Sequence, residues 1–131
     1  MDAAQALSEL TALSAQITAA IVLDENGSPL ASTLDDGRAG ELAQTAQELV
    51  AAAGRAADRD GRDLAQLEVS TPSGSVFVVR DGARTIAATT RPEPAAGLVF
   101  YDLKSCLRRI ADQPKPKPKP RPRKKAGDAA A

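Results

Sequence analysis

The stretch that decides the fold is Gly74–Ala88, GSVFVVRDGARTIAA. Ser75–Arg80 is a continuous apolar run, and the Asp81-Gly82 pair behind it is the strongest short hairpin signal in the chain, because glycine accepts the positive φ of a two-residue turn. The small residues after this pair return as a second strand. The stretch therefore predicts a β-hairpin. Since its first strand is apolar on both faces, we expect helices on both sides of the sheet.

A second hairpin is predicted upstream, in Ala19–Thr33, AAIVLDENGSPLAST. Ala19–Leu23 is too short for an independent helix and contains Ile and Val, which favours a strand. The Asn-Gly pair supplies the turn, and Pro29 opens a weaker, edge-like strand over Leu30–Thr33.

Helical patterns surround the two hairpins. Apolar residues at helical spacing predict a first helix over Ala3–Gln16, and an alanine-rich pattern predicts a long middle helix over about Ala39–Arg59. Leu34–Gly40 between them is expected to be a polar connection. The stripes of the first helix and of a last helix consist of Leu7, Leu10, Leu13 and Ile17, and of Phe100, Leu103, Leu107 and Ile110.

One further strand is predicted over Asp63–Ser70, where apolar and polar residues alternate. Ala65, Leu67 and Val69 point one way and the polar residues the other. This pattern is typical of a strand with one poorly covered face, so we expect it at an edge of the sheet. The predicted order is α-β-β-α-β-β-β-α, an α+β fold.

The charges divide the chain into two parts. Residues 1–111 carry 10 Lys and Arg against 15 Asp and Glu, whereas residues 112–131 carry 7 against 2. We therefore expect one acidic folded domain over residues 1–111 and a basic, disordered tail over residues 112–131. Much of the 43% hydrophobic content is alanine and there is no Trp, so a thin core favours a partner subunit that adds buried surface.

Few residues can carry catalytic or metal-binding chemistry. The chain has no His and one Cys, which excludes Ser-His-Asp and Cys-His sites and a zinc site. It also lacks the Gly-x4-Gly-Lys-[Ser/Thr] phosphate loop. The DENG segment is similar to the start of a calcium loop, but Pro29 occupies the sixth position, where that loop requires Gly. We expect no cofactor, no metal, no small-molecule substrate and no enzymatic activity.

The lone Cys106 fits a reducing compartment, and its place in the last helix favours a small buried side chain. The N-terminal residues do not form a signal peptide, and no apolar run approaches the roughly 20 residues that span a bilayer. We expect a cytoplasmic protein.

The element order, with AIVLDENGSPLAS after the first helix and GSVFVVRDGARTIAA as the late hairpin, resembles the roadblock superfamily. These are dynein-light-chain-like modules whose bacterial relatives regulate small Ras-like GTPases. The resemblance covers about residues 5–111. It implies a five-stranded antiparallel sheet with the middle helix on one face and the terminal helices on the other. It also implies a homodimer in which two third strands pair edge to edge and two middle helices pack together.

The dimer or partner interface expected from these features lies on the middle helix and the edge strand. Alanines along the helix would permit a close approach of two helices, although some of its apolar side chains must pack on their own sheet. The expected interface residues are Leu42, Ala46, Leu49, Val50, Ala53, Leu67 and Val69.

Three arginines could be proposed as arginine fingers that reach into a GTPase site. Nothing in the sequence orients them, so we favour solvated helix faces or an interaction with the C-terminal end of the last helix. They are Arg55, Arg108 and Arg109.

The tail contains QPKPKPKPRPRKK, in which alternating proline predicts an extended, polyproline-like segment. Its prolines are two residues apart and miss the PxxP pattern, and no aromatic residue is present for base stacking. The cations could contact nucleic acid, anionic lipid or an acidic protein, or only keep the chain in solution. They are Lys115, Lys117, Lys119, Arg121, Arg123, Lys124 and Lys125.

Together these features favour a non-catalytic, homodimeric regulatory or adaptor module that binds a small Ras-like GTPase and biases its nucleotide state. Two alternatives stay open. One is a structural scaffold dimer without nucleotide dependence. The other is a tether that holds nucleic acid or an anionic membrane through the basic tail.

Overall fold

The computed structural model describes residues 1–57 and 65–111. The predicted order of elements, αββαβββα, is confirmed. The predicted tail, the end of the middle helix at Arg59 and the start of the edge strand at Asp63 lie outside the described residues. The elements are α1 (Ala3–Leu13), β1 (Ile17–Leu23), β2 (Pro29–Ser32), α2 (Asp36–Ala57), β3 (Ala65–Thr71), β4 (Gly74–Asp81), β5 (Arg84–Thr90) and α3 (Ala96–Ala111).

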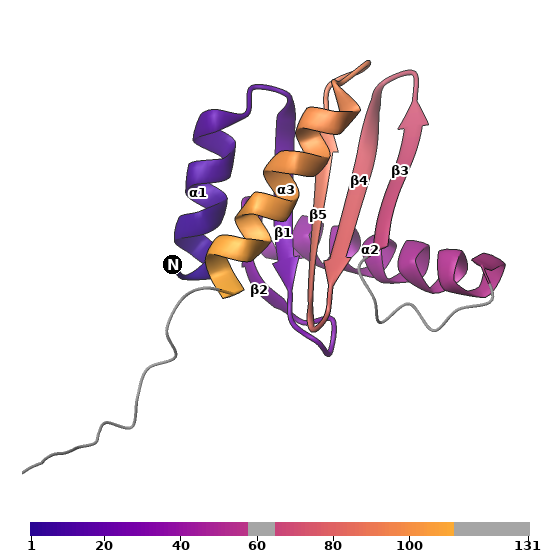
Figure 1. The fold of residues 1–131 in the computed structure, drawn as a ribbon, viewed down its shortest axis with the longest axis horizontal. Coiled ribbons are helices and arrows are strands. Elements are labelled where there is room, and N and C mark those ends of the chain that lie inside the picture. The colour runs from indigo at the N-terminus through magenta and orange to yellow at the C-terminus, as the bar shows by residue number, and fades with distance from the viewer. Residues whose placement is uncertain (58–64, 112–131) are drawn as a thin grey trace, which may run out of the picture.

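The five strands form one antiparallel sheet in the order β2-β1-β5-β4-β3. Helices α1 and α3 cover one face of this sheet, and α2 crosses the other face behind it (Figure 1). The two-sided coverage predicted from the apolar strands is therefore confirmed. Both predicted hairpins are present, as β1–β2 and β4–β5, and β4 and β5 lie in the interior of the sheet.

Each face of the sheet has its own hydrophobic core. The larger core lies under α1 and α3 and includes Phe77, whose ring meets Phe100 edge to face at a centroid distance of 5.0 Å. The smaller core lies under α2 and is built mostly from alanine and short aliphatic side chains. Its buried members are Ile21, Leu23, Ala39, Leu42, Ala43, Ala46, Val78 and Ala87.

The first helix is shorter than predicted. It ends at Leu13, because Ser14 takes extended backbone angles and Ile17 already opens β1. Leu13, expected on the buried stripe, is 77% exposed. The stripe consists of Ala6, Leu7 and Leu10 instead, so the helical spacing of Leu13 and Ile17 was coincidental.

The middle helix begins earlier than predicted, so the expected connection Leu34–Gly40 is wrong from Asp36 onward. The reason is an N-cap at Asp35. Its Oδ1 accepts a hydrogen bond from the backbone N of Arg38 at 3.0 Å, which satisfies a backbone donor that the first helical turn leaves free.

The two edges of the sheet differ. Strand β2 has four residues, starts at Pro29, and its register with β1 shifts between Val22 and Leu23. Strand β3 has seven residues and pairs with β4 in an unbroken register. Proline and a register shift blunt an edge against further pairing, whereas a regular strand leaves its outer N–H and C=O groups available. The predicted edge position of β3 is confirmed, and among the described strands β3 is the regular edge, which we call the open edge.

Two glycines at the ends of β4 allow a matched test of the backbone geometry at the β3–β4 and β4–β5 turns. Gly74 and Gly82 both have positive φ, of 153° and 60°. A Cβ at Gly74 would collide with the backbone O of Thr90, whereas a Cβ at Gly82 would meet no neighbouring atom. We expect Gly74→Ala to lower the free energy of unfolding by more than about 3 kcal/mol, and Gly82→Ala by only about 1 kcal/mol. Urea unfolding measures both, and equal losses would contradict the close approach of β4 to Thr90.

Candidate functional site on the α2 face of the sheet

Cross-strand pairing arranges the α2 face of the sheet in three rows. Helix α2 lies along the middle row, in which Leu67 pairs with Val78, Val78 with Ala87 and Ala87 with Ile21. Because side chains alternate along each strand, the flanking rows on this face lie two residues away on either side. These flanking rows determine which surfaces α2 leaves uncovered.

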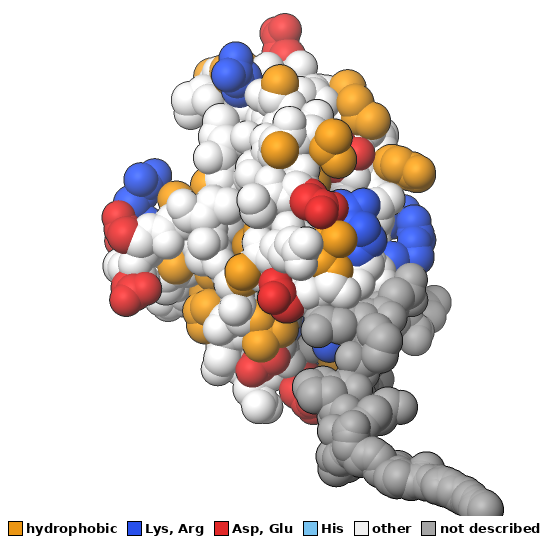
Figure 2. Space-filling model, turned by 90° about the vertical axis from the view of Figure 1, so that its left-hand side faces the viewer, with side chains coloured by type: hydrophobic (Ala, Val, Ile, Leu, Met, Phe, Trp, Pro, Cys, Tyr) orange, Lys and Arg blue, Asp and Glu red, His pale blue; other side chains and the backbone are white. Residues whose placement is uncertain are grey.

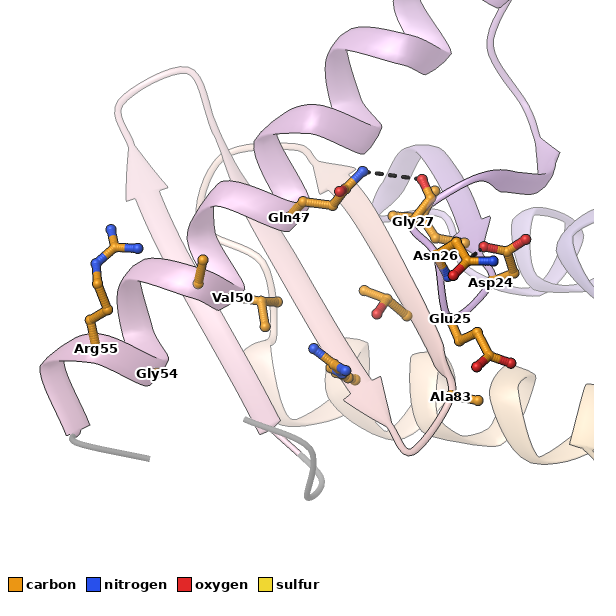
Figure 3. Close-up of a pocket in the computed structure, with 13 residues that line it drawn as sticks. Asp24, Glu25, Asn26, Gly27, Gln47, Val50, Gly54, Arg55 and Ala83 are labelled. Atoms are coloured by element: carbon orange, nitrogen blue, oxygen red, sulfur yellow. Dashed lines mark hydrogen bonds between the residues drawn. The ribbon is translucent and has the colours of Figure 1, made fainter. Parts of the chain in front are cut away.

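The first flanking row forms the floor of a groove of about 790 Å³ beside α2. In this row Arg80 pairs with Thr85 and Thr85 with Leu23. The second half of α2 forms one wall, and the β1–β2 turn and the end of the β4–β5 hairpin form the other (Figure 3). The lining residues are Leu23, Asp24, Glu25, Asn26, Gly27, Gln47, Val50, Ala51, Gly54, Arg55, Arg80, Ala83 and Thr85.

Hydrogen bonds fix the turn that forms the far wall of this groove. Asp24 Oδ1 accepts from the backbone N of Asn26 at 2.8 Å and of Ser28 at 3.0 Å. Gln47 Nε2 donates to the carbonyl O of Gly27 at 3.1 Å, which ties the turn to α2 (Figure 3). The groove is thus bounded by a fixed helix and a fixed turn.

The groove carries charges of both signs. Arg55 and Arg80 come from α2 and β4, while Asp24 and Glu25 come from the turn on the other side. The Asp24 carboxylate is occupied by the turn hydrogen bonds, whereas Arg80 Nε, among the described residues, makes one long contact of 3.5 Å with the carbonyl O of Gly82. Such a groove suits a polar macromolecular contact more than an apolar small molecule.

The second flanking row, which we call the outer row, lies on the other side of α2. In the outer row Val69 pairs with Val76, and Val76 pairs with Thr89. Val69 is 42% exposed, and Val76 and Thr89 are half-buried. The outer row is therefore a partly uncovered, largely apolar strip that reaches the open β3 edge.

Helix α2 is buried most deeply in its first half, although Leu49 and Val50 of the second half still pack against the core under it. Its four fully buried residues end at Ala46, and the apolar residues beyond, Leu49, Val50 and Ala53, are half-buried. In Figure 1 this second half continues past β3, so that α2 overhangs the open edge.

The expected interface residues fall into two groups. Leu42 and Ala46 are buried against their own sheet, so they offer no surface to another molecule in a single chain. The sequence pattern did not separate them from the rest, because both groups share the apolar side of one helix. The accessible group consists of Leu49, Val50, Ala53, Leu67 and Val69.

The three candidate arginines lie on different surfaces. Arg55 lines the groove. Arg108 is exposed on α3, and Arg109 Nε lies 3.9 Å from Glu9 Oε1 of α1. The structure does not bring the three arginines together.

Cys106 lies on the buried side of α3 and is fully buried, as predicted. Burial raises the pKa of its thiol from 9.0 to about 11, while Arg109 lowers this pKa and Glu9 raises it by smaller amounts. At pH 8 the reactive thiolate then amounts to about one in a thousand molecules, against roughly one in ten for an unperturbed thiol.

We expect maleimide to label the native protein at pH 8 at least about 100-fold more slowly than the urea-unfolded protein. Because the folded pKa is the higher one, this thiol leaves the free energy of unfolding unchanged below pH 9 and lowers it as the pH rises from 9 to 11. Mass spectrometry of labelled protein measures the rates. Equal rates would show that Cys106 is accessible.

In residues 1–57 and 65–111, no three His, Cys, Asp or Glu side chains are grouped so that they could hold a metal ion. No helix in these ranges is long and apolar enough to cross a membrane. Among the described residues that line the groove, Thr85 is the only one with a hydroxyl, and none has a thiol.

The groove was not predicted from the sequence. The Asn-Gly turn was identified, but the contact between Gln47 and Gly27 joins residues 20 positions apart and has no local signal. Arg80, Ala51 and Gly54 were not predicted as site residues, because nothing in the sequence around them relates them to the β1–β2 turn.

The fold and the α2 face define a class of protein. This is a small α+β domain with a two-sided antiparallel sheet, one open edge, and a charged groove beside its middle helix. Residues 3–90 match the family model of the Roadblock/LC7 domain. The chain belongs to this family.

Solved structures show the same fold. The crystal structure of a Roadblock/LC7 domain from Streptomyces avermitilis is 23% identical, with a TM-score of 0.74 over 85% of this chain and 96% of that one. A second structure from that organism is 22% identical, with a TM-score of 0.64 over 81% and 95%. Myxococcus xanthus MglB is 14% identical, with a TM-score of 0.60 over 84% of each chain. No curated protein matches the chain significantly.

Proposed function

We propose that this protein is a non-catalytic homodimeric adaptor of the cytoplasm that binds a small Ras-like GTPase and biases its nucleotide state. The observation that carries the proposal is the regular, open β3 edge in a chain of the Roadblock/LC7 family. Family members of the bacterial type regulate such GTPases, as the sequence resemblance implies.

The β3 edge supports a dimer that makes one continuous sheet. Among the described strands β3 pairs only with β4. The N–H and C=O groups of every second β3 residue point away from β4, and in the described sheet they have no strand partner. A second copy would supply such a strand in antiparallel orientation, and a two-fold axis would then run perpendicular to the sheet.

The outer row supports a place for the partner's helix. In this dimer the overhanging second half of each α2 would extend over the partner's sheet. There its half-buried Leu49 and Ala53, which do not line the groove, would meet Val69 and Val76 of the partner's outer row. Small residues along this half of the helix allow two helix axes to approach closely.

The groove supports a separate contact for the GTPase. It is floored by the row of Arg80, Thr85 and Leu23, on the opposite side of α2 from the outer row. Dimerisation through β3 and the outer row would therefore leave the groove uncovered. Its fixed walls and mixed charges fit a polar protein surface such as a switch loop.

The test uses the small Ras-like GTPases of the same organism, beginning with any that is encoded beside this chain. Release of a fluorescent GDP analogue and of inorganic phosphate is measured with and without the full chain. We expect a change in one of these rates and tighter binding to one nucleotide state, because only a difference in affinity can shift the equilibrium. The double variant Arg55→Glu, Arg80→Glu should abolish binding, while Arg38→Glu at the start of α2, outside the groove, serves as a charge-matched control.

Two outcomes would change the conclusion. Equal binding to the GDP form and to the form loaded with a GTP analogue would favour the scaffold dimer without nucleotide dependence. Binding that survives the groove variant would move the contact to another surface of the domain.

A further inference from the structure

The second half of α2, residues 47–57, separates two surfaces of the molecule. The residues of this half that line the groove are Gln47, Val50, Ala51, Gly54 and Arg55. Leu49 and Ala53 are half-buried and do not line the groove, and they belong to the surface that the proposed dimer would cover. Residues four positions apart share one side of a helix. One helical segment therefore carries the wall of the groove on one side and the dimer contact on the other.

The walls of the groove are well defined, but this half of α2 is held only lightly by its own sheet. Among the described residues of the helix, the fully buried ones end at Ala46. Beyond it, Leu49 and Val50 pack against the core under α2, and both are half-buried. Gly54 lies within this half as well, and glycine is a poor helix former. Because a segment with little buried apolar surface opens locally at a lower free energy than a fully packed one, we expect this half to open more readily than the first.

The far wall of the groove depends on the same helical segment. Gln47 follows directly after Ala46 and is joined to the β1–β2 turn, because its Nε2 donates to the carbonyl O of Gly27 at 3.1 Å (Figure 3). The fit is close, since a Cβ at Gly27 would lie 2.6 Å from Gln47 Cδ. Opening of α2 from Gln47 onward would therefore remove one wall of the groove and release the other.

We infer that dimerisation completes the groove, because the partner copy would hold the second half of α2 in place. This inference rests on the dimer and on the groove contact of the proposed function. In that dimer Leu49 and Ala53 are covered by the partner's outer row, so the helical state of this segment gains buried apolar surface that the opened state lacks. The groove is then fully formed in the dimer and only part of the time in the single chain.

This coupling makes binding in the groove depend on the concentration of the chain. When a site is formed in only a fraction of the molecules, its apparent affinity falls by that fraction. Dimerisation removes this loss, so the dimer binds the GTPase more tightly than the single chain does. Because coupling between two binding events is reciprocal, the GTPase strengthens the dimer by the same factor.

The test begins with the full chain alone, so its outcome does not depend on any GTPase. Hydrogen exchange followed by mass spectrometry compares the wild type with Val69→Asp. Val69 lies on β3 and does not line the groove, so a change within α2 reports the loss of the dimer. We expect the backbone amides of residues 49–57 to exchange at least about tenfold faster in Val69→Asp, while those of residues 39–46 keep their rates.

The matched control is Leu30→Asp on β2, at the opposite edge of the sheet. Figure 2 shows the molecule from that side, with hydrophobic side chains interspersed among charged ones. We expect this variant to keep both the dimer and the slow exchange of residues 49–57. Dilution of the wild type reaches the single chain without any substitution, so a variant that fails to fold does not hide the result.

Light scattering on the same samples separates the failure of this inference from the failure of the proposed function. If Val69→Asp is a monomer in which residues 49–57 exchange as slowly as in the wild-type dimer, the coupling is wrong and the proposed dimer stands. If the wild type is a monomer at every concentration, the proposed dimer and the coupling are both wrong.

A second measurement uses the GTPase found by the test of the proposed function. Val69→Asp should weaken GTPase binding at least about tenfold, although Val69 lies outside the groove. Gln47→Ala should weaken it as well, because the turn is then released, and Gln44→Ala is the matched control on the same helix outside the groove. Unchanged binding by Val69→Asp would overturn the coupling and leave the groove contact in place. If no GTPase binds the wild type, the proposed function fails, and the exchange experiment still decides whether dimerisation orders the groove.

Discussion

Val69→Asp is expected to convert the proposed dimer into monomers. Val69 is 42% exposed, lies on the open β3 edge and belongs to the outer row. A carboxylate there would lie in the pairing region of both copies and would lose its hydration without gaining a partner. We expect the dissociation constant to rise at least about 100-fold, which corresponds to about 2.8 kcal/mol. Light scattering behind size-exclusion chromatography measures the mass of the particle over a dilution series.

The matched control for this prediction is Leu30→Asp. Leu30 is 47% exposed on β2, the blunted edge at the other side of the sheet. The same charge at a similar exposure should leave the mass unchanged. Leu67→Asp is the less clean variant, because Leu67 also packs against the core under α2. A stable dimer of Val69→Asp, or a monomeric wild type, would remove the β3 edge from the interface.

Phe77→Ala is expected to have the largest effect on stability. Phe77 is fully buried at the centre of the core under α1 and α3, and the chain contains only two Phe and no Trp. Removing a buried ring leaves a cavity, and such changes cost about 3–5 kcal/mol. That is a large share of the roughly 5–15 kcal/mol that stabilises a typical natural domain. Urea unfolding followed by circular dichroism measures the loss.

The control for the loss of an aromatic ring is Tyr101→Ala. Tyr101 is 64% exposed on α3, so its removal should change the free energy of unfolding by no more than about 0.5 kcal/mol. If the two variants lose the same free energy, the core does not depend on the contact between Phe77 and Phe100.

The sequence predicted the architecture well, because its strongest signals are local. The Asp-Gly and Asn-Gly pairs each produced the expected hairpin. The two-sided apolar strand β4 lies in the sheet interior, and the alternating strand β3 lies at the edge. In each case the pattern reflects which faces of one strand are covered, and that information is contained in the strand itself.

The errors arose where two local signals compete or where the deciding contact is distant. The start of α2 was predicted too late. Gly37 and Gly40 disfavour a helix, whereas Asp35 is an N-cap residue that favours one, and the structure follows the N-cap. Leu13 fits the helical spacing of α1, but it is the last residue of that helix and its side chain is exposed.

The candidate site was only partly predictable. Helical spacing identified the apolar side of α2, but only the crossing of α2 over the middle row separates buried Leu42 and Ala46 from accessible Leu49 and Val50. The groove depends on Gln47 meeting Gly27, a tertiary contact that no window of sequence contains.

The unequal edges of the sheet set a limit on assembly. A sheet grows by adding strands to free borders, and a molecule with two regular borders could add copies without end, as fibrils do. Here Pro29 and the shifted register at Leu23 close one border, and in the described sheet β3 is the border that remains. In the proposed dimer, two molecules joined through that border would form a ten-stranded sheet that ends in two closed strands, so association of this kind would stop at a pair and would not continue into a filament.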